Sequence, residues 1–233
     1  RKGEKENREK VEKPAITAVE TNADKQSAFV KMVDAMPNTP SEPVFLDYNK
    51  DLQKSKLGAA EVLYVPNKDN SIFRLKYRYK IGTLNDLKQS LASSYIQFLG
   101  TDTMSAEEIS KEFYKIACSF NISSGEEYTT VSIEGLQDNF EKAVSLYETI
   151  INNVKPDDAA LASLKARIDK SRKDRKANKG AIMQGLTSYA IYGKDNKFNY
   201  TLSEKDLNGT TSKELVDRLK NLNNYDQTVM YYG

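Results

Sequence analysis

The sequence contains no histidine among its 233 residues. Histidine is the commonest metal ligand and the usual general base near neutral pH, so its absence excludes a histidine-ligated zinc centre built from this chain alone. It also removes the usual base for activating a serine or cysteine nucleophile. The one cysteine, Cys118, cannot form an internal disulfide, and its neighbours Phe120 and Ile122 predict a small buried side chain there.

Long apolar runs are missing as well, because no stretch approaches the roughly 20 residues that a membrane-spanning helix needs. The charged N-terminal segment has no hydrophobic stretch behind it, so we expect no signal peptide in this chain. The 35 basic and 33 acidic side chains nearly cancel. That balance gives no reason to expect nucleic acid or an anionic membrane as a partner.

Residues 1–57 differ in composition from the rest of the chain. Residues 1–13 alternate acidic and basic side chains and read as a solvated helix or a disordered tail. Four of the six prolines follow before residue 44, with room for one short helix over residues 27–36. We therefore predict a linker over residues 1–57 and a folded domain over residues 58–233. The charged start and the strand-like end suggest a piece of a longer protein.

The clearest strand pattern covers residues 73–81. Apolar side chains alternate there with Arg74, Lys76, Arg78 and Lys80, which is typical of a strand in a sheet that is packed on one face only. Residues 62–65 predict a shorter strand before it. Residues 118–122 and 128–134 predict a hairpin, and residues 227–232 predict a last strand.

Helices are predicted between these strands, from apolar stripes at helical spacing over residues 85–99, 105–116, 136–151, 157–168, 182–192 and 211–222. Two of them begin with capping boxes, Ser105 with Glu108 and Thr211 with Glu214. The order β-β-α-α-β-β-α-α-α-α-β predicts an α+β domain, in which an antiparallel sheet carries helices on one face.

Residues 58–233 resemble one domain of the insulinase/pitrilysin family of zinc peptidases. In that family a strand ends in glycine, a helix carries the motif HxxEH, Gly-Thr follows, and another helix and a strand pair come next. The corresponding pieces here are Tyr79-Lys-Ile-Gly82, the helix over residues 85–99, Gly100-Thr101, Ser105-Ala-Glu-Glu-Ile109 and Glu126-Glu-Tyr-Thr129.

The resemblance also locates what is missing. In HxxEH two histidines bind zinc and the glutamate serves as the general base for the attacking water. Counted back from Gly100, the histidine positions fall on Leu91 and Tyr95 and the base position on Ser94. The family's third ligand is a later glutamate, and the comparable segment offers only Asp169 among cations. The resemblance therefore implies no catalytic residue and no metal ligand in this chain, and we expect Leu91 and Tyr95 to pack inward.

Members of this family consist of two similar halves that enclose a chamber, and only the first half carries zinc. The chain resembles the linker and first domain of the second half. The resemblance implies a partner, either the catalytic half of the same polypeptide or a paired subunit, with zinc in that catalytic domain and none in this chain. It further implies peptide substrates and an extracytoplasmic or periplasmic location in a bacterium.

Residues 163–179 contain eight basic side chains, among them Arg172, Arg175 and Lys176. No aromatic residue is interleaved with them, as single-stranded nucleic acid binding would favour, so a solvated helix face is the simpler interpretation. Both this run and the row of Arg74, Lys76 and Arg78 could instead face peptides inside the chamber. The leading hypothesis is a non-catalytic domain of a zinc peptidase, and the alternative is an interaction or scaffold module in a wholly inactive family member.

Overall fold

The computed structural model describes residues 15–16, 21, 25–38 and 40–233, and it divides into two units, Arg1–Phe45 and Leu46–Gly233. The charged segment over residues 1–13 lies outside the described residues. In the first unit the short helix predicted from the sequence is confirmed as α1, Ala28–Asp34, whose N-cap residue Ser27 accepts a hydrogen bond from the Val30 amide.

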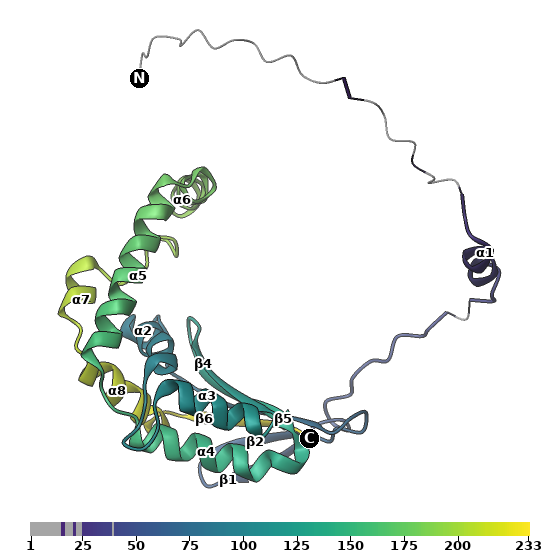
Figure 1. Cartoon of the computed structure of the whole chain (residues 1–233), viewed down its shortest axis with the longest axis horizontal. Coiled ribbons are helices and arrows are strands. Elements are labelled where there is room, and N and C mark those ends of the chain that lie inside the picture. Colours follow the sequence, from purple (N-terminus) through teal and green to yellow (C-terminus); the bar gives the residue numbers. More distant parts are fainter. Residues whose placement is uncertain (1–14, 17–20, 22–24, 39) are drawn as a thin grey trace. The chain divides into compact units, whose positions relative to one another are not determined.

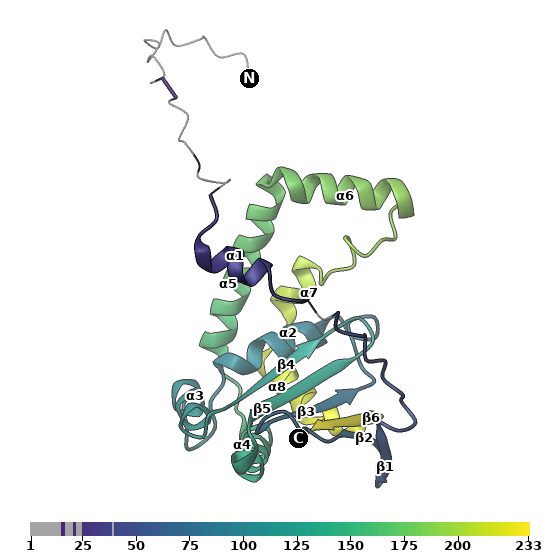
Figure 2. The same ribbon diagram turned by 90° about the vertical axis from the view of Figure 1, so that its right-hand side faces the viewer.

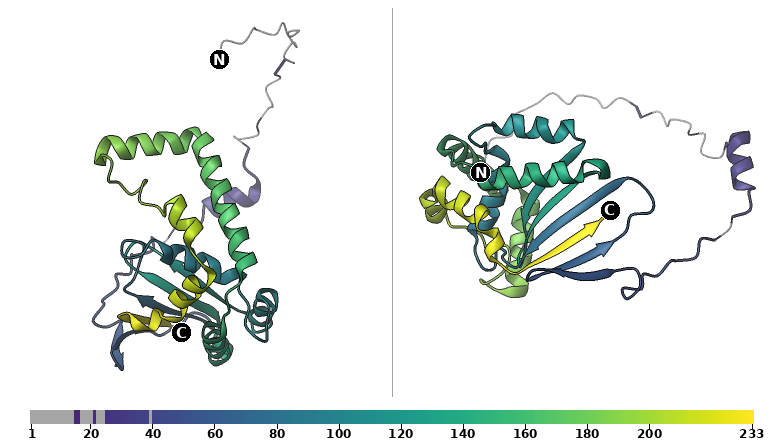
Figure 3. Two further views of the ribbon diagram at one scale, coloured as in Figure 1. Left: turned by 90° about the vertical axis from the view of Figure 1, so that its left-hand side faces the viewer. Right: turned by 90° about the horizontal axis from the view of Figure 1, so that it is seen from below.

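The second unit is built on one six-stranded sheet with the order β1-β2-β6-β3-β5-β4 (Figure 3). The strands are β1 Gln53–Leu57, β2 Ala60–Val65, β3 Ile72–Tyr79, β4 Cys118–Ser124, β5 Thr129–Leu136 and β6 Gln227–Tyr232. Four of the five pairings are antiparallel, and β2 with β6 is parallel. The predicted α+β class is confirmed, but β2 and β3 are not neighbours, because β6 lies between them.

Strand β1 also corrects the predicted boundary between linker and domain. The pattern gave no strand before residue 58, yet Gln53–Leu57 pairs in register with Ala60–Tyr64 across a two-residue turn. Gly58 occupies that turn with a φ of 62°, a left-handed conformation that glycine adopts without the penalty of a side chain. The segment up to Leu57 therefore contributes the edge strand of the sheet.

The helices gather on one face of this sheet, which gives the second unit two layers (Figure 1). Their bounds are α2 Lys88–Tyr95, α3 Ala106–Lys115, α4 Phe140–Asn153, α5 Asp158–Ala177, α6 Lys179–Tyr192, α7 Glu204–Gly209 and α8 Ser212–Lys220. Helix α5 rises away from the sheet and α6 crosses its far end (Figure 2). Helix α7 was not predicted, and α2 begins three residues later than predicted, since the chain first makes a turn on the Gly82 carbonyl.

The core fills the space between the sheet and α2, α3, α4 and α8. The alternation along β3 is confirmed, because Phe73, Leu75 and Tyr79 are buried while Arg74, Lys76 and Arg78 are exposed. Aromatic side chains join the two layers, with Phe73 edge-on against Phe140 at 5.1 Å and Tyr77 stacked on Tyr147 at 6.4 Å between ring centres. These pairings aim the other side of β3 at solvent.

Both predicted capping boxes are confirmed at the starts of α3 and α8. The Ser105 amide donates to the Glu108 carboxylate at 2.7 Å, and the Thr211 amide donates to Glu214 at 3.2 Å. These backbone hydrogen bonds stabilise the charged carboxylate and lower the pKa of both glutamates. The two helices that flank α2 therefore begin at residues fixed by local sequence.

Candidate functional site

The helix that resembles the catalytic helix of zinc peptidases is α2, and its side chains serve packing. Leu91 is buried in the core, and Ser94 is exposed with its hydroxyl donating to the Ser90 carbonyl at 3.0 Å. Tyr95 is fully buried, and burial raises the pKa of its hydroxyl. That hydroxyl donates to the Asp157 carbonyl at 2.5 Å and accepts from the Asp157 amide at 2.8 Å.

Helix α5 carries the segment that resembles the source of the third zinc ligand. Asp169 is half-buried there, one turn before Lys173. Among residues 15–16, 21, 25–38 and 40–233, no three histidine, cysteine, aspartate or glutamate side chains lie together in a way that could hold a metal ion. On α2, Leu91 and Tyr95 therefore serve packing, and the Ser94 hydroxyl is hydrogen-bonded within its own helix.

The uncovered face of the sheet brings together the cations of β3. Arg74, Lys76 and Arg78 point to this face, and cross-strand pairing sets them beside Glu134, Ser132 and Thr130 on β5 and beside Tyr232, Met230 and Thr228 on β6. None of these nine side chains is buried. We call the surface formed by Arg74, Lys76, Arg78 and their partners on β5 and β6 the open face.

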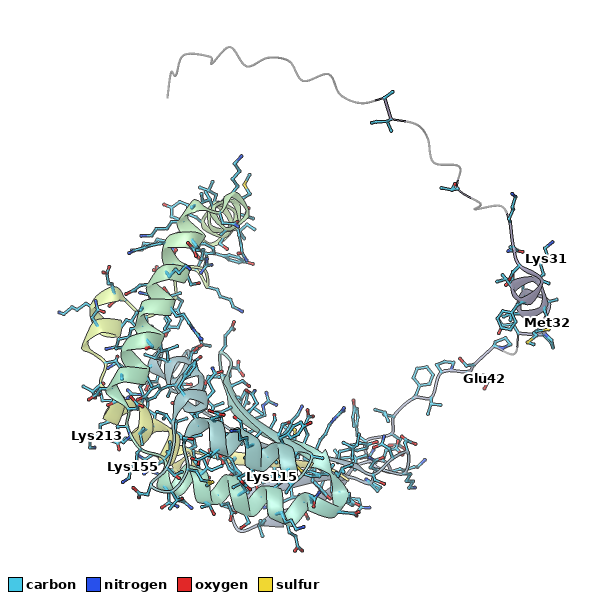
Figure 4. The ribbon with its side chains drawn as sticks, in the orientation of Figure 1. Lys31, Met32, Glu42, Lys115, Lys155 and Lys213 are labelled. Atoms are coloured by element: carbon cyan, nitrogen blue, oxygen red, sulfur yellow. The ribbon has the colours of Figure 1, made fainter. Side chains whose placement is uncertain are left out.

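Two of the three cations of the open face have neighbours that hold them in place. The guanidinium of Arg78 lies 3.7 Å from the ring centre of Tyr128, and the Arg74 Nε lies 3.7 Å from a Glu134 carboxylate oxygen. The Arg74–Glu134 pair is well exposed, so solvent screens it and leaves the face cationic. On the helices and their connections, by contrast, Lys115, Lys155 and Lys213, which are labelled in Figure 4, are paired with Glu112, Asp102 and Asp217.

Two hollows meet on the open face. One, of about 570 Å³, is lined by Lys76, Arg78, Met230 and the β4–β5 turn. The other, of about 420 Å³, adds apolar side chains to Arg74, Lys76 and Met230, namely Leu52, Leu63, Val65, Tyr231 and Tyr232. Lys76 and Met230 belong to both, so apolar surface adjoins charged surface that includes Glu126 and Glu127 as well as the cations.

The cations of the open face were predicted from the sequence, whereas the apolar residues beside them were not. The alternation in β3 predicted the cations directly, because they lie on one strand. Met230 comes beside Lys76 through the antiparallel pairing of β3 with β6, and Leu63 on β2 comes beside Met230 through the parallel pairing of β2 with β6. No local sequence pattern predicts the pairing of β2 with β6, although each segment alone was predicted as a strand.

The second predicted cluster, Arg172, Arg175 and Lys176, lies on the far part of α5 and does not join the open face. Arg172 donates to the Leu202 carbonyl at 2.5 Å, and the Arg175 guanidinium lies 4.0 Å from the ring centre of Phe198. Lys176 is exposed. Two of the three cations therefore tie α5 to the segment after α6, and the cluster is not one binding surface.

Cys118 begins β4 and is buried, 9% exposed, and burial raises the pKa of its thiol. A raised pKa keeps the thiol protonated near neutral pH, which is the opposite of what a nucleophile needs. This agrees with the prediction that Cys118 packs as a small apolar side chain.

Residues 94–205 match the family model described as Insulinase (Peptidase family M16). Among curated proteins, none matches the chain in sequence. In the part of the chain that the structure describes, no helix combines the length and the apolar character that crossing a bilayer requires.

Solved structures share the fold at low sequence identity. The peptidase M16 inactive domain from Pseudomonas fluorescens has a TM-score of 0.64 at 17% identity, covering 78% of this chain and 46% of that one. The periplasmic protease PqqL from Escherichia coli has a TM-score of 0.65 at 16% identity, covering 83% of this chain and 22% of that one. A variant of the ferredoxin protease FusC, in complex with Arabidopsis ferredoxin, has a TM-score of 0.67 at 14% identity, covering 85% of this chain and 23% of that one. The chain thus spans less than half the length of these proteins.

Proposed function

We propose that the chain is a non-catalytic domain of the insulinase family (peptidase family M16), whose model matches residues 94–205, and that it forms part of a peptide-binding chamber. Zinc-dependent proteolysis would be carried out by another domain, in the same polypeptide or in a paired subunit. The absence of histidine from all 233 residues supports the assignment to the non-catalytic part. The likeness to an M16 domain that is itself described as inactive agrees with it.

The observation that carries the proposal is the open face. A sheet that packs helices on one side and presents Arg74, Lys76 and Arg78 on the other offers a broad surface for an extended chain. Charged groups on such a surface steer and orient a ligand more than they add affinity. The adjoining apolar residues, Leu63 and Met230 among them, would then contribute contact area.

The substrates of the parent protein would be polypeptides, and its zinc would lie in the catalytic domain. The complex of FusC with ferredoxin shows that one structural relative binds a protein. A periplasmic location in a bacterium follows by analogy with PqqL, which is a periplasmic protease. Both points extend the properties of relatives to this chain and belong to the proposal.

The proposal is tested by the binding of a fluorescently labelled, unstructured peptide that contains glutamate and leucine, followed by anisotropy. We expect the variant Lys76→Glu/Arg78→Glu to weaken binding about tenfold, which corresponds to about 1.4 kcal/mol. The matched control is Lys170→Glu/Lys173→Glu, which changes the net charge equally on the exposed side of α5. Equal weakening by both double variants would show a general charge effect and refute a role for the open face.

The alternative is an interaction or scaffold module in a parent protein without any metal site. Helix α6 favours it, because Ile182, Met183, Leu186 and Tyr189 form an exposed apolar stripe that a neighbouring domain of the parent could cover. Zinc analysis of the full-length parent separates the two functions. One zinc per parent chain supports the chamber, whereas a zinc-free parent without proteolytic activity supports the scaffold.

A further inference from the structure

A third hollow, of about 310 Å³, lies on the helical side of the sheet between α2 and α5. One face of α2 lines it with Leu87, Ser90, Leu91 and Ser94, and α5 faces it with Ile168 and Arg172. The segment before α7 and α7 itself add Tyr200, Thr201, Leu202 and Leu207, and Thr83 before α2 completes the lining. Its volume is at the lower end of the range for small-molecule sites in proteins, which is about 300–1,000 Å³.

The lining of this hollow has a definite chemical character. Arg172 is its one charged side chain, and no carboxylate lies among the lining residues. The remaining residues divide evenly between hydroxyl side chains and apolar side chains. A cation set among hydroxyl groups beside an apolar wall fits an anion that has an apolar body.

Arg172 is held in a defined position. It is half-buried, and its Nη2 donates to the Leu202 carbonyl at 2.5 Å. That hydrogen bond uses one of the five N–H donors of a guanidinium, so further donors remain for a ligand. The planar group is suited to binding a carboxylate through two parallel hydrogen bonds.

We propose that the hollow between α2 and α5 binds a small monocarboxylate with an apolar body. The carboxylate binds Arg172, and the apolar part packs against the partly exposed side chains of Leu87, Ile168 and Leu202. A doubly charged phosphate fits less well, since one guanidinium would have to balance it beside five leucine and isoleucine side chains. A free carboxylic acid and the C-terminal residue of a peptide share this chemistry.

This site is separate from the open face, because it is formed by helices on the other side of the sheet and shares no residue with the two hollows there. Its occupancy therefore does not depend on the proposed chamber function. Substitutions at Lys76 and Arg78 should leave it unchanged, so failure of one proposal is distinguishable from failure of the other.

The experiment titrates the full chain with N-acetyl-leucine and with N-acetyl-leucine amide, followed by amide chemical shifts in NMR spectra. We expect saturable shifts with the acid and at least tenfold weaker binding of the amide, because the amide cannot form the charged pair with Arg172. A short peptide ending in leucine and its C-terminally amidated form then distinguish the two sources of the carboxylate. Tighter binding of the peptide acid identifies a chain terminus, and equal binding identifies the single residue as the ligand.

Two variants and one control complete the test. Arg172→Gln removes the cation, and Ser94→Leu places a larger side chain at an exposed position on the edge of the hollow. Each variant should weaken the binding of N-acetyl-leucine at least tenfold. Arg175→Gln is the matched control, since it lies on the same helix but outside the lining of the hollow. The proposal is overturned if acid and amide bind equally, if neither binds, or if a folded Ser94→Leu variant binds as the parent chain does.

Discussion

Replacing Tyr95 by phenylalanine removes one oxygen atom from a fully buried ring and leaves two main-chain groups of Asp157 without their partner. The hydroxyl accepts from the amide at 2.8 Å and donates to the carbonyl at 2.5 Å, so it joins the end of α2 to the residue that caps α5. The ring itself stays, and no cavity larger than one oxygen atom results. The variant therefore isolates the two hydrogen bonds.

The expected cost follows from the exposure of the groups involved. A hydrogen bond contributes about 0.5–1.5 kcal/mol net, and an unpaired buried polar group costs about 1–3 kcal/mol. Asp157 is exposed, so water can form hydrogen bonds with some of the main-chain groups that lose the hydroxyl. We expect Tyr95→Phe to lower the free energy of unfolding by about 2 kcal/mol. For a domain of this size that corresponds to a fall in Tm of about 4–8 °C.

Urea unfolding followed by circular dichroism measures this difference. The matched control is Tyr114→Phe, the same chemical change at a side chain that is 86% exposed on α3, where we expect a change within about 0.5 kcal/mol. If Tyr95→Phe also stays within that range, the hydroxyl does not stabilise the junction of α2 and α5. The packing of the ring, and not its hydroxyl, would then account for the contribution of Tyr95 to stability.

Three further predictions concern the metal, the caps and one glycine. Elemental analysis of the 233-residue chain should find only trace zinc, and stoichiometric zinc would contradict our interpretation of α2. The pKa of Glu108 and of Glu214 is lowered from 4.5, so their contribution to stability is present above about pH 4.5 and is lost as pH falls through the folded-state pKa. In urea titrations between about pH 5 and pH 3, the variant Glu108→Gln/Glu214→Gln should therefore lose less stability than the parent chain does. An unchanged pH dependence would contradict this cause. Gly82→Ala should lower the free energy of unfolding by about 3 kcal/mol or more, because the added Cβ would overlap the main chain of Glu126. The control Gly209→Ala has open space around the added Cβ and should not destabilise the domain. Equal urea midpoints for the two variants would contradict this reasoning.

The parts of the fold that could be predicted from sequence are those encoded locally. The alternation in β3 reports one packed face, and the capping boxes before α3 and α8 fix two helix starts to the residue. Strand β1 could not be predicted in this way, because all five of its side chains are exposed and its pattern, Gln-Lys-Ser-Lys-Leu, has no apolar face. The position of β6 between β2 and β3 depends on packing over the whole chain, which short-range periodicity does not contain.

In the candidate sites, too, the features that one segment encodes could be predicted, and those that depend on distant segments could not. The cations of the open face follow from one strand and were predicted, while the apolar residues beside them come from strands far away in sequence. The basic run on α5 was predicted as one group, but its members face different ways: Arg172 lines a hollow and Arg175 stacks on Phe198. A helix distributes neighbouring residues around its axis, so nearness in sequence does not imply a common surface.

The place of β6 has a consequence for how the domain acquires its structure. Tyr64 and Gly233 are joined by a hydrogen bond although they lie 169 positions apart. Until β6 arrives, β1 and β2 form one hairpin, while β3, β5 and β4 form a separate antiparallel sheet whose β3 edge is unpaired. Such long-range closure slows folding and leaves strand edges free to pair with other molecules in the meantime. On the ribosome, the nascent domain therefore completes its sheet only after its last strand has emerged, and deletion of that strand would divide one sheet into two.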